Sequence, residues 1–237
     1  MSRRVWLLCL LAPAMLATAC NVVSVGPTQT EHETVALEAI DSAEISLKMG
    51  VGDLTVSGGG DNLLDADFTY NVAEWKPQIT YNTRGQTGVL SVEQPSVSSG
   101  VPDDQVKNQW ELRLENTVEK EVSVSLGVGK GNLSLGGLNL TNLDVNVGVG
   151  ETTIDLTGAW TQNADIKIKG GVGETTVILP PDVGVRVTTQ TGIGDILAYD
   201  LRQNGKVYTN DAYETSDIRL TIDVTGGVGK IVLKLGD

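Results

Sequence analysis

A short pattern recurs through this chain and constrains its fold more than any other feature: Gly-Val-Gly, once Gly-Ile-Gly, between two runs of alternating apolar residues. The four central copies start 21, 23 and 21 residues apart. Spacing this regular indicates an internal repeat. We predict that the glycines of all six copies are structural turn residues. They are Gly50, Gly52, Gly127, Gly129, Gly148, Gly150, Gly171, Gly173, Gly192, Gly194, Gly227 and Gly229.

The residues on both sides of each copy alternate between apolar and polar. Five before the first glycine stand Ile45, Val122, Leu143, Ile166, Val187 and Ile222, and six after it stand Val56, Leu133, Ile154, Val177, Ala198 and Leu233. A period of two predicts strands with one buried face. Glycines between two strands permit the positive φ and close backbone approach of a sharp corner. A strand, a corner and a second strand every ~22 residues predict one coil of an all-β solenoid.

An antiparallel β-sandwich is the alternative fold, because glycine corners also occur in sandwiches. An identical register in several copies favours the solenoid. With 28 glycines, of which twelve fall in register in the six copies, and only 4% aromatic residues, the composition fits an ordered repeat and not a low-complexity segment.

The first 19 residues have the features of a secretory signal. Arg3 and Arg4 precede an apolar run that is too short to be a permanent membrane span. Small residues then end at Cys20, which is typical of a bacterial lipoprotein signal, and Cys20 is the only cysteine outside the apolar run. We predict a signal peptide over 1–19 and lipidation of Cys20, with an ordinary cleaved signal as the alternative. Several acyl chains on one residue would anchor the chain stably.

The rest of the chain divides into a tether and one domain. Polar residues over 20–40, including the only histidine, His32, predict a flexible tether. The domain spans 41–237, with a less regular half over 41–118 and regular coils over 119–237. Trp110 shares a strand face with Leu112 and Leu114, which predicts a core position.

Candidate partner contacts lie outside the repeats. Asn204-Gly205 between strand-like residues predicts a projecting hairpin, with Tyr199, Tyr208 and Tyr213 nearby. The Ser-, Pro- and Gly-rich segment 94–104 predicts a surface loop. Trp75, before Lys76-Pro77, either covers the end of the core or serves as an exposed anchor.

Charge and chemistry exclude several functions. Without Arg3 and Arg4 the chain has 15 basic and 30 acidic residues, a net charge of −15, which repels phosphate backbones and argues against nucleic acid. One histidine in a predicted tether offers no nucleophile–base pair. The sequence shows no metal cluster, and lysines after the glycines at Lys130 and Lys230 are wrong for a calcium ladder. We therefore expect no enzyme activity, no cofactor and no small-molecule substrate.

The chain resembles the bacterial toast-rack domain family, which is related to the C-terminal domain of LiaF-like envelope stress proteins and to head-domain adhesins. The motifs that carry the resemblance are 49–56, 66–72, 75–77, 135–140, 210–213 and the Gly-Val-Gly coils. The resemblance covers about 41–237 and implies a right-handed β-solenoid, usually anchored to lipid or membrane.

These observations lead to an expected function. We expect an extracytoplasmic lipoprotein, held to a bacterial membrane through its N-terminal lipid, whose solenoid is a protein-interaction or envelope-stress sensing module. The alternative is a surface adhesin or structural protein that binds a glycan or envelope polymer.

Overall fold

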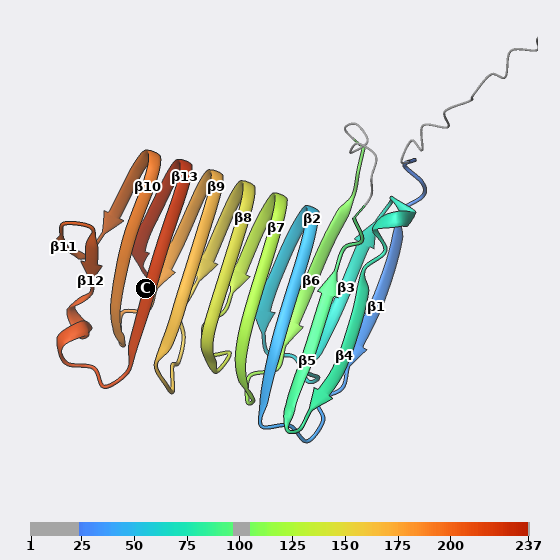
Figure 1. Cartoon of the computed structure of the whole chain (residues 1–237), viewed down its shortest axis with the longest axis horizontal. Helices are drawn as coiled ribbons and strands as arrows, with labels where there is room; N and C mark the ends of the chain where they lie inside the picture. Colours follow the sequence, from blue (N-terminus) through green and yellow to red (C-terminus); the bar gives the residue numbers. More distant parts are fainter. Residues whose placement is uncertain (1–23, 97–104, 237) are drawn as a thin grey trace, which may run out of the picture.

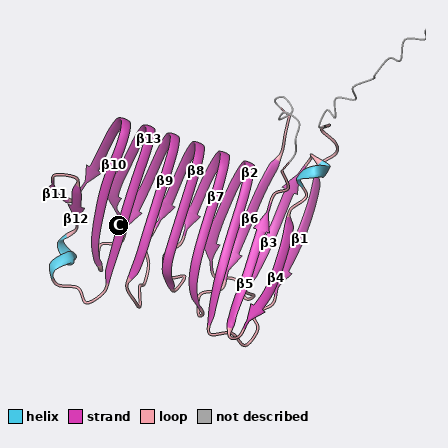
Figure 2. Cartoon of the chain, viewed as in Figure 1, coloured by secondary structure: helices cyan, strands magenta, loops and turns pink. Residues whose placement is uncertain are grey.

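The structure is a computed structural model that describes residues 24–96 and 105–236. The predicted signal, Cys20 and most of the 94–104 loop lie outside the described residues. The strands in chain order are β1 (Gln29–Val35), β2 (Ser42–Gly58), β3 (Leu64–Tyr70), β4 (Gln78–Arg84), β5 (Thr87–Glu93), β6 (Asn108–Leu114), β7 (Glu119–Ser134), β8 (Leu140–Asp155), β9 (Ala164–Leu179), β10 (Gly184–Tyr199), β11 (Arg202–Asn204), β12 (Val207–Thr209) and β13 (Arg219–Leu235). Two 3-10 turns, η1 (Ala73–Trp75) and η2 (Asp211–Glu214), are the helical elements of the described chain (Figure 2).

Six long strands form the body of the molecule. Each has 16 or 17 residues and carries one Gly-X-Gly copy near its middle. Figure 1 shows these strands side by side, each folded back on itself so that its two arms lie in two facing layers. Neighbouring long strands are parallel and in register, so that Val128 pairs with Val149 and Val149 with Val172. The predicted solenoid is confirmed, and this parallel pairing excludes the antiparallel sandwich.

The coils do not stack in the order of the sequence. The strand order through the body is β2-β7-β8-β9-β13-β10, so β13 lies between β9 and β10. Its residues Val228 and Gly229 pair with Val172 and Gly173 on one side and with Ile193 and Gly194 on the other. The last coil of the sequence is therefore not the last coil in space.

The two layers separate beyond β2. The first arm of β2 pairs with β5, which continues to β4, and its second arm pairs with β6, which continues to β3 and β1. The tether predicted over 20–40 is wrong for 29–35, because β1 pairs with all seven residues of β3. His32 lies on β1, and its Nδ1 atom is 2.7 Å from a carboxylate oxygen of Asp67. Polar composition suggested a spacer, but an edge strand is also polar.

One continuous hydrophobic core lies between the two layers. Eleven of the twelve inward positions named from the sequence are buried in it, including Ile45, Val122, Leu143 and Ile166, and Ala198 is only partly buried. Trp110 is buried, as predicted, and packs edge-on against Phe68 with 5.4 Å between ring centroids.

Candidate functional site

The glycine corners fix the shape of the whole body. The two glycines of each copy are required for different reasons. The second glycine has a φ between +135° and +148°, as at Gly129 and Gly150, which L side chains rarely adopt. The first glycine of each copy has a negative φ. From Gly127 onward, however, a Cβ atom at this position would collide with a carbonyl oxygen of the neighbouring strand. Both are turn glycines, as the repeat indicated.

The residues between the glycines form an exposed apolar ridge along the bend. Val128, Val149, Val172, Val228 and Ile193 are between 46% and 72% exposed. At the other end the equivalent Val51 is partly covered by a small cluster with Val72, Trp75 and Val106. The alternation in the sequence did not mark these outward residues as a continuous surface.

Two of the four predicted partner contacts are not at the surface. The side chain of Trp75 is buried in the cluster beside Val51, so its interpretation as a cover for the core holds and the exposed anchor is wrong. Tyr208 is also buried, with its hydroxyl 3.0 Å from Nε2 of Gln203. Tyr213 is half-buried and Tyr199 is exposed. Of the four, Tyr199 is the one with an exposed side chain.

The Asn-Gly hairpin is present, as predicted, and its turn contains Gly205 at φ +61°. It is not free of the body, because β12 pairs with Arg186–Thr188 of β10 and extends that layer by two short strands. At the other end of the molecule, Gln94 is buried and its Oε1 accepts hydrogen bonds from the backbone of Gly50 (2.9 Å) and Val51 (3.1 Å). The start of the predicted loop therefore holds the first bend.

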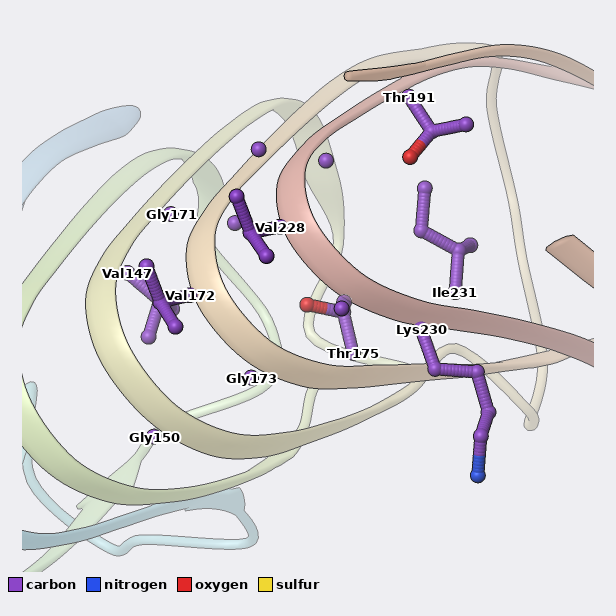
Figure 3. Close-up of a pocket in the computed structure, with 14 residues that line it drawn as sticks. Val147, Gly150, Gly171, Val172, Gly173, Thr175, Thr191, Val228, Lys230 and Ile231 are labelled. Carbon is purple, nitrogen blue, oxygen red and sulfur yellow. The ribbon is translucent and has the colours of Figure 1, made fainter. Parts of the chain in front are cut away.

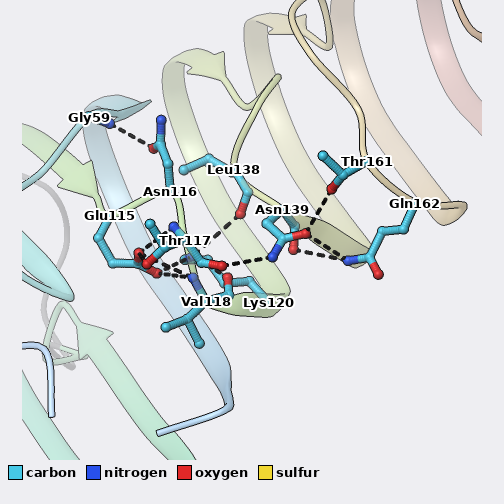
Figure 4. Close-up of polar contacts among 10 residues, drawn as sticks. All are labelled: Gly59, Glu115, Asn116, Thr117, Val118, Lys120, Leu138, Asn139, Thr161 and Gln162. Carbon is cyan, nitrogen blue, oxygen red and sulfur yellow. Dashed lines mark hydrogen bonds and ion pairs between the residues drawn. The ribbon is translucent and has the colours of Figure 1, made fainter. Parts of the chain in front are cut away.

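A buried ion pair lies where β6 passes to β7 (Figure 4). Lys120 is completely buried and its Nζ contacts Glu115, which is also buried, and the carbonyl oxygen of Leu138 at 3.3 Å. Burial lowers the pKa of Lys120, although Glu115 acts in the opposite direction. Burial works to raise the pKa of Glu115, but hydrogen bonds from Lys120 and Thr117 outweigh it and hold that pKa below its ordinary value. The other polar partners of the pair, Thr117, Val118 and Leu138, all lie in adjacent turns. The ion pair therefore has a structural role.

Two of the cavities in the described part of the chain differ in size and openness. The bend encloses about 10 Å³ between Thr175, Thr191 and Ile231 (Figure 3), which is room for about one water molecule. A wider groove of about 480 Å³ is open on the first-arm face of β5, β2, β7 and β8. Serine, asparagine and acidic side chains line it, among them Ser46, Ser123, Asn142 and Asp144.

The described residues contain no group of three or more histidine, cysteine, aspartate or glutamate side chains placed to hold a metal ion. Among the same residues, no helix has the length and apolar character needed to cross a membrane. The fold and these surfaces define a class of protein: an all-β domain of stacked, sharply bent parallel strands that presents an exposed apolar ridge and an open groove.

The chain belongs to the toast-rack family. Residues 24–178 match the family model described as the N-terminal domain of toast_rack, DUF2154, and residues 128–233 match the model described as cell wall-active antibiotics response LiaF, C-terminal. The resemblance drawn from the sequence motifs is therefore confirmed. No curated protein matches the chain.

A solved structure supports the same assignment. It is the crystal structure titled as that of a putative cell adhesion protein from Clostridium sporogenes, and its sequence is 32% identical to this chain. The alignment covers 89% of this chain and 100% of the Clostridium sporogenes chain, with a TM-score of 0.86. A structure titled as a putative adhesin from Bacteroides fragilis is 11% identical over 87% of this chain and 97% of its own. Its TM-score is 0.26.

Proposed function

We propose that this protein is a non-enzymatic envelope lipoprotein, anchored through Cys20, whose solenoid is a protein-interaction or stress-sensing module. The observation that carries the proposal is the match of the regular coils to the LiaF C-terminal model, which is named for a response to cell wall-active antibiotics. The surfaces fit this role, because the body presents an apolar ridge and an open polar groove.

The anchor is tested by cell fractionation of the wild type, Cys20→Ala and Cys9→Ala. Cys9→Ala is the matched control, because it removes the other cysteine and leaves the predicted lipidation residue in place. We expect the wild type and Cys9→Ala proteins in the membrane fraction. The Cys20→Ala protein should be found in the soluble extracytoplasmic fraction, or should retain its signal peptide. Equal membrane association of all three proteins would contradict lipid anchoring.

A second function, adhesion through a glycan or envelope polymer, is favoured by the printed name of the Clostridium sporogenes structure. The groove lined by serine, asparagine and acidic residues is the surface we assign to it, since hydroxyl and amide groups hydrogen-bond sugars. Cosedimentation with purified cell wall tests it. Binding that Asn142→Ala weakens, and that Asn82→Ala at an exposed position of β4 outside the groove lining leaves unchanged, supports adhesion. If the protein does not cosediment with cell wall, the adhesion function is excluded.

A further inference from the structure

The solenoid is capped on only one of its two layers at the β10 end. On the first arm of β10, Arg186–Thr188 pairs with β12, and β11 lies beyond β12. On the second arm, residues 195–199 pair with β13 on one side and with no described strand on the other. A row of backbone N–H and C=O groups is therefore open along this edge.

The side chains of the open edge are less buried than their counterparts one strand inward. Ile231 and Leu233 of β13 are 3% and 0% exposed, whereas their neighbours in register, Ile196 and Ala198, are only half-buried. On the outer face Leu197 and Tyr199 are 38% and 51% exposed. The core is thus open at this end, and terminal solenoid coils usually need a polar cap.

The other edges of the sheet are protected in the ways that natural proteins use. The strand β1 carries Glu31, His32 and Glu33, and Glu31 pairs with Lys76 at 2.8 Å. The edge strand β4 carries Arg84, which pairs with Glu44, and β11 has only three polar residues. The second arm of β10 has one charge, Asp195, among apolar residues.

We propose that this edge binds an extended segment of a partner protein, which adds one strand to the second arm of β10. The segment would carry a basic residue opposite Asp195 and branched apolar residues over Ile196 and Ala198. Strand addition of this kind takes its affinity from main-chain hydrogen bonds and its specificity from alternate side chains. The inference rests on the proposed function in that it names the partner class of an interaction module.

The charge expected of the segment follows from the row in which Asp195 lies. Across neighbouring strands this row reads Glu174, Lys230 and Asp195. Lys230 pairs with Glu174 at 2.7 Å, and Asp195 makes no ion pair within the described residues. A basic side chain on the next strand would complete the alternation, since opposite charges directly across two strands attract.

The hairpin argues against a second copy of this chain at the edge. It extends two strands beyond β10 on the first arm, which is about 10 Å at the usual strand spacing. A second copy would bring two layers to the edge and would meet the hairpin, whereas one extended segment occupies only the second arm. The overall charge of −13 also makes two copies repel each other.

The probe is a peptide with the sequence of residues 230–235, Lys-Ile-Val-Leu-Lys-Leu, between Gly-Ser ends, because β13 already pairs with β10 in this way. A second peptide replaces both lysines with glutamate. Binding of each labelled peptide to the purified full chain in mild detergent is measured by fluorescence anisotropy. Hydrogen exchange with and without peptide locates the binding site.

The matched variants are Asp195→Lys and Asp217→Lys, which make the same charge change at two exposed positions. We expect wild type and Asp217→Lys to prefer the lysine peptide, and Asp195→Lys to lose about three- to tenfold in affinity for it and to gain affinity for the glutamate peptide. New exchange protection should fall within 195–199. Thermal melts confirm that both variants fold.

Three results would overturn the proposal: no saturable binding, protection at β1 or β4, or equal behaviour of both variants. Light scattering that shows a dimer of the chain alone, broken by Leu197→Lys, would assign the edge to a second copy. None of these results bears on the membrane anchor, so failure here and failure of the proposed function are separate outcomes.

Discussion

The carbonyl oxygen of Gly52 lies where a side chain of Gly129 would have to be, so that a Cβ atom added to Gly129 would overlap it. The same relationship links Gly150 to Gly129, Gly173 to Gly150, Gly229 to Gly173 and Gly194 to Gly229. Six strands therefore bend at one level, and the backbones touch across the bend. This column of glycines holds the two layers together at one end of every coil.

Alanine at Gly129 should destabilise the domain strongly. The substitution combines a φ of +146° with the overlap on Gly52, and we expect a loss of at least about 3 kcal/mol in the free energy of unfolding. Urea denaturation measures it. Gly85→Ala is the matched control, because Gly85 has a φ of +64° and open space around it, so the cost should be about 1–2 kcal/mol. Equal losses at both positions would contradict the packed column.

Removal of one member of the buried pair Glu115–Lys120 should lower the free energy of unfolding strongly, and replacement of both members should lower it much less. Lys120→Met leaves the carboxylate of Glu115 buried without its cation, which costs about 3–5 kcal/mol. The double variant Glu115→Gln, Lys120→Met should recover much of this loss. Urea denaturation of the three proteins tests it, and a double variant that is no better than the single one would contradict the reading.

The same pair predicts an acid dependence of stability. The pKa of Glu115 is lower in the folded chain than its ordinary value of 4.5. The ionised carboxylate therefore stabilises the folded chain above pH 4.5, and this stabilisation is lost as the pH falls through the lower pKa of the folded chain. Between pH 6 and pH 3, wild type should lose more stability than Glu115→Gln. Parallel curves for the two proteins would show that Glu115 does not titrate with folding.

The two aromatic residues at opposite ends of the solenoid should behave differently on truncation. Trp75→Ala removes a buried side chain beside Val51 and should cost about 3–5 kcal/mol. Tyr199→Ala changes an exposed side chain and should stay within about 0.5 kcal/mol. Thermal unfolding of both variants checks the pair. A small effect at Trp75 would restore its interpretation as an exposed anchor.

The strand β1 should be protected from hydrogen exchange. Its seven residues pair with β3, and a tether would exchange them at the rate of an unfolded chain. Amide exchange followed by mass spectrometry on 29–35 decides between the two. Asp67→Ala, which removes the partner of His32, should increase exchange locally and leave the regular coils unchanged.

Much of the fold could be predicted from the repeat, because the apolar positions around each corner reappear as the core. The burial of Trp110 also followed from alternation. The position of β13 between β9 and β10 could not be predicted, because all coils share one pattern and any pair of neighbours satisfies it. Lys120 was missed for a related reason: its burial depends on Glu115 and on the carbonyl group of Leu138, which lies 18 residues further along the chain.

The candidate surfaces were less predictable than the core. Turn chemistry located the hairpin through Asn204-Gly205, but no local signal showed that Tyr208 faces inward. The open edge at Leu197 arises because the hairpin covers one arm of β10 and not the other. That asymmetry exists only in the folded chain.

The most direct test of an anchored interaction module is crosslinking in intact cells, followed by purification of the tagged wild type, Cys20→Ala and Cys9→Ala proteins. The proposal predicts a discrete envelope protein that is recovered with wild type and Cys9→Ala and is lost with Cys20→Ala. Recovery of envelope polymer alone, or of the same partner with all three proteins, would contradict it.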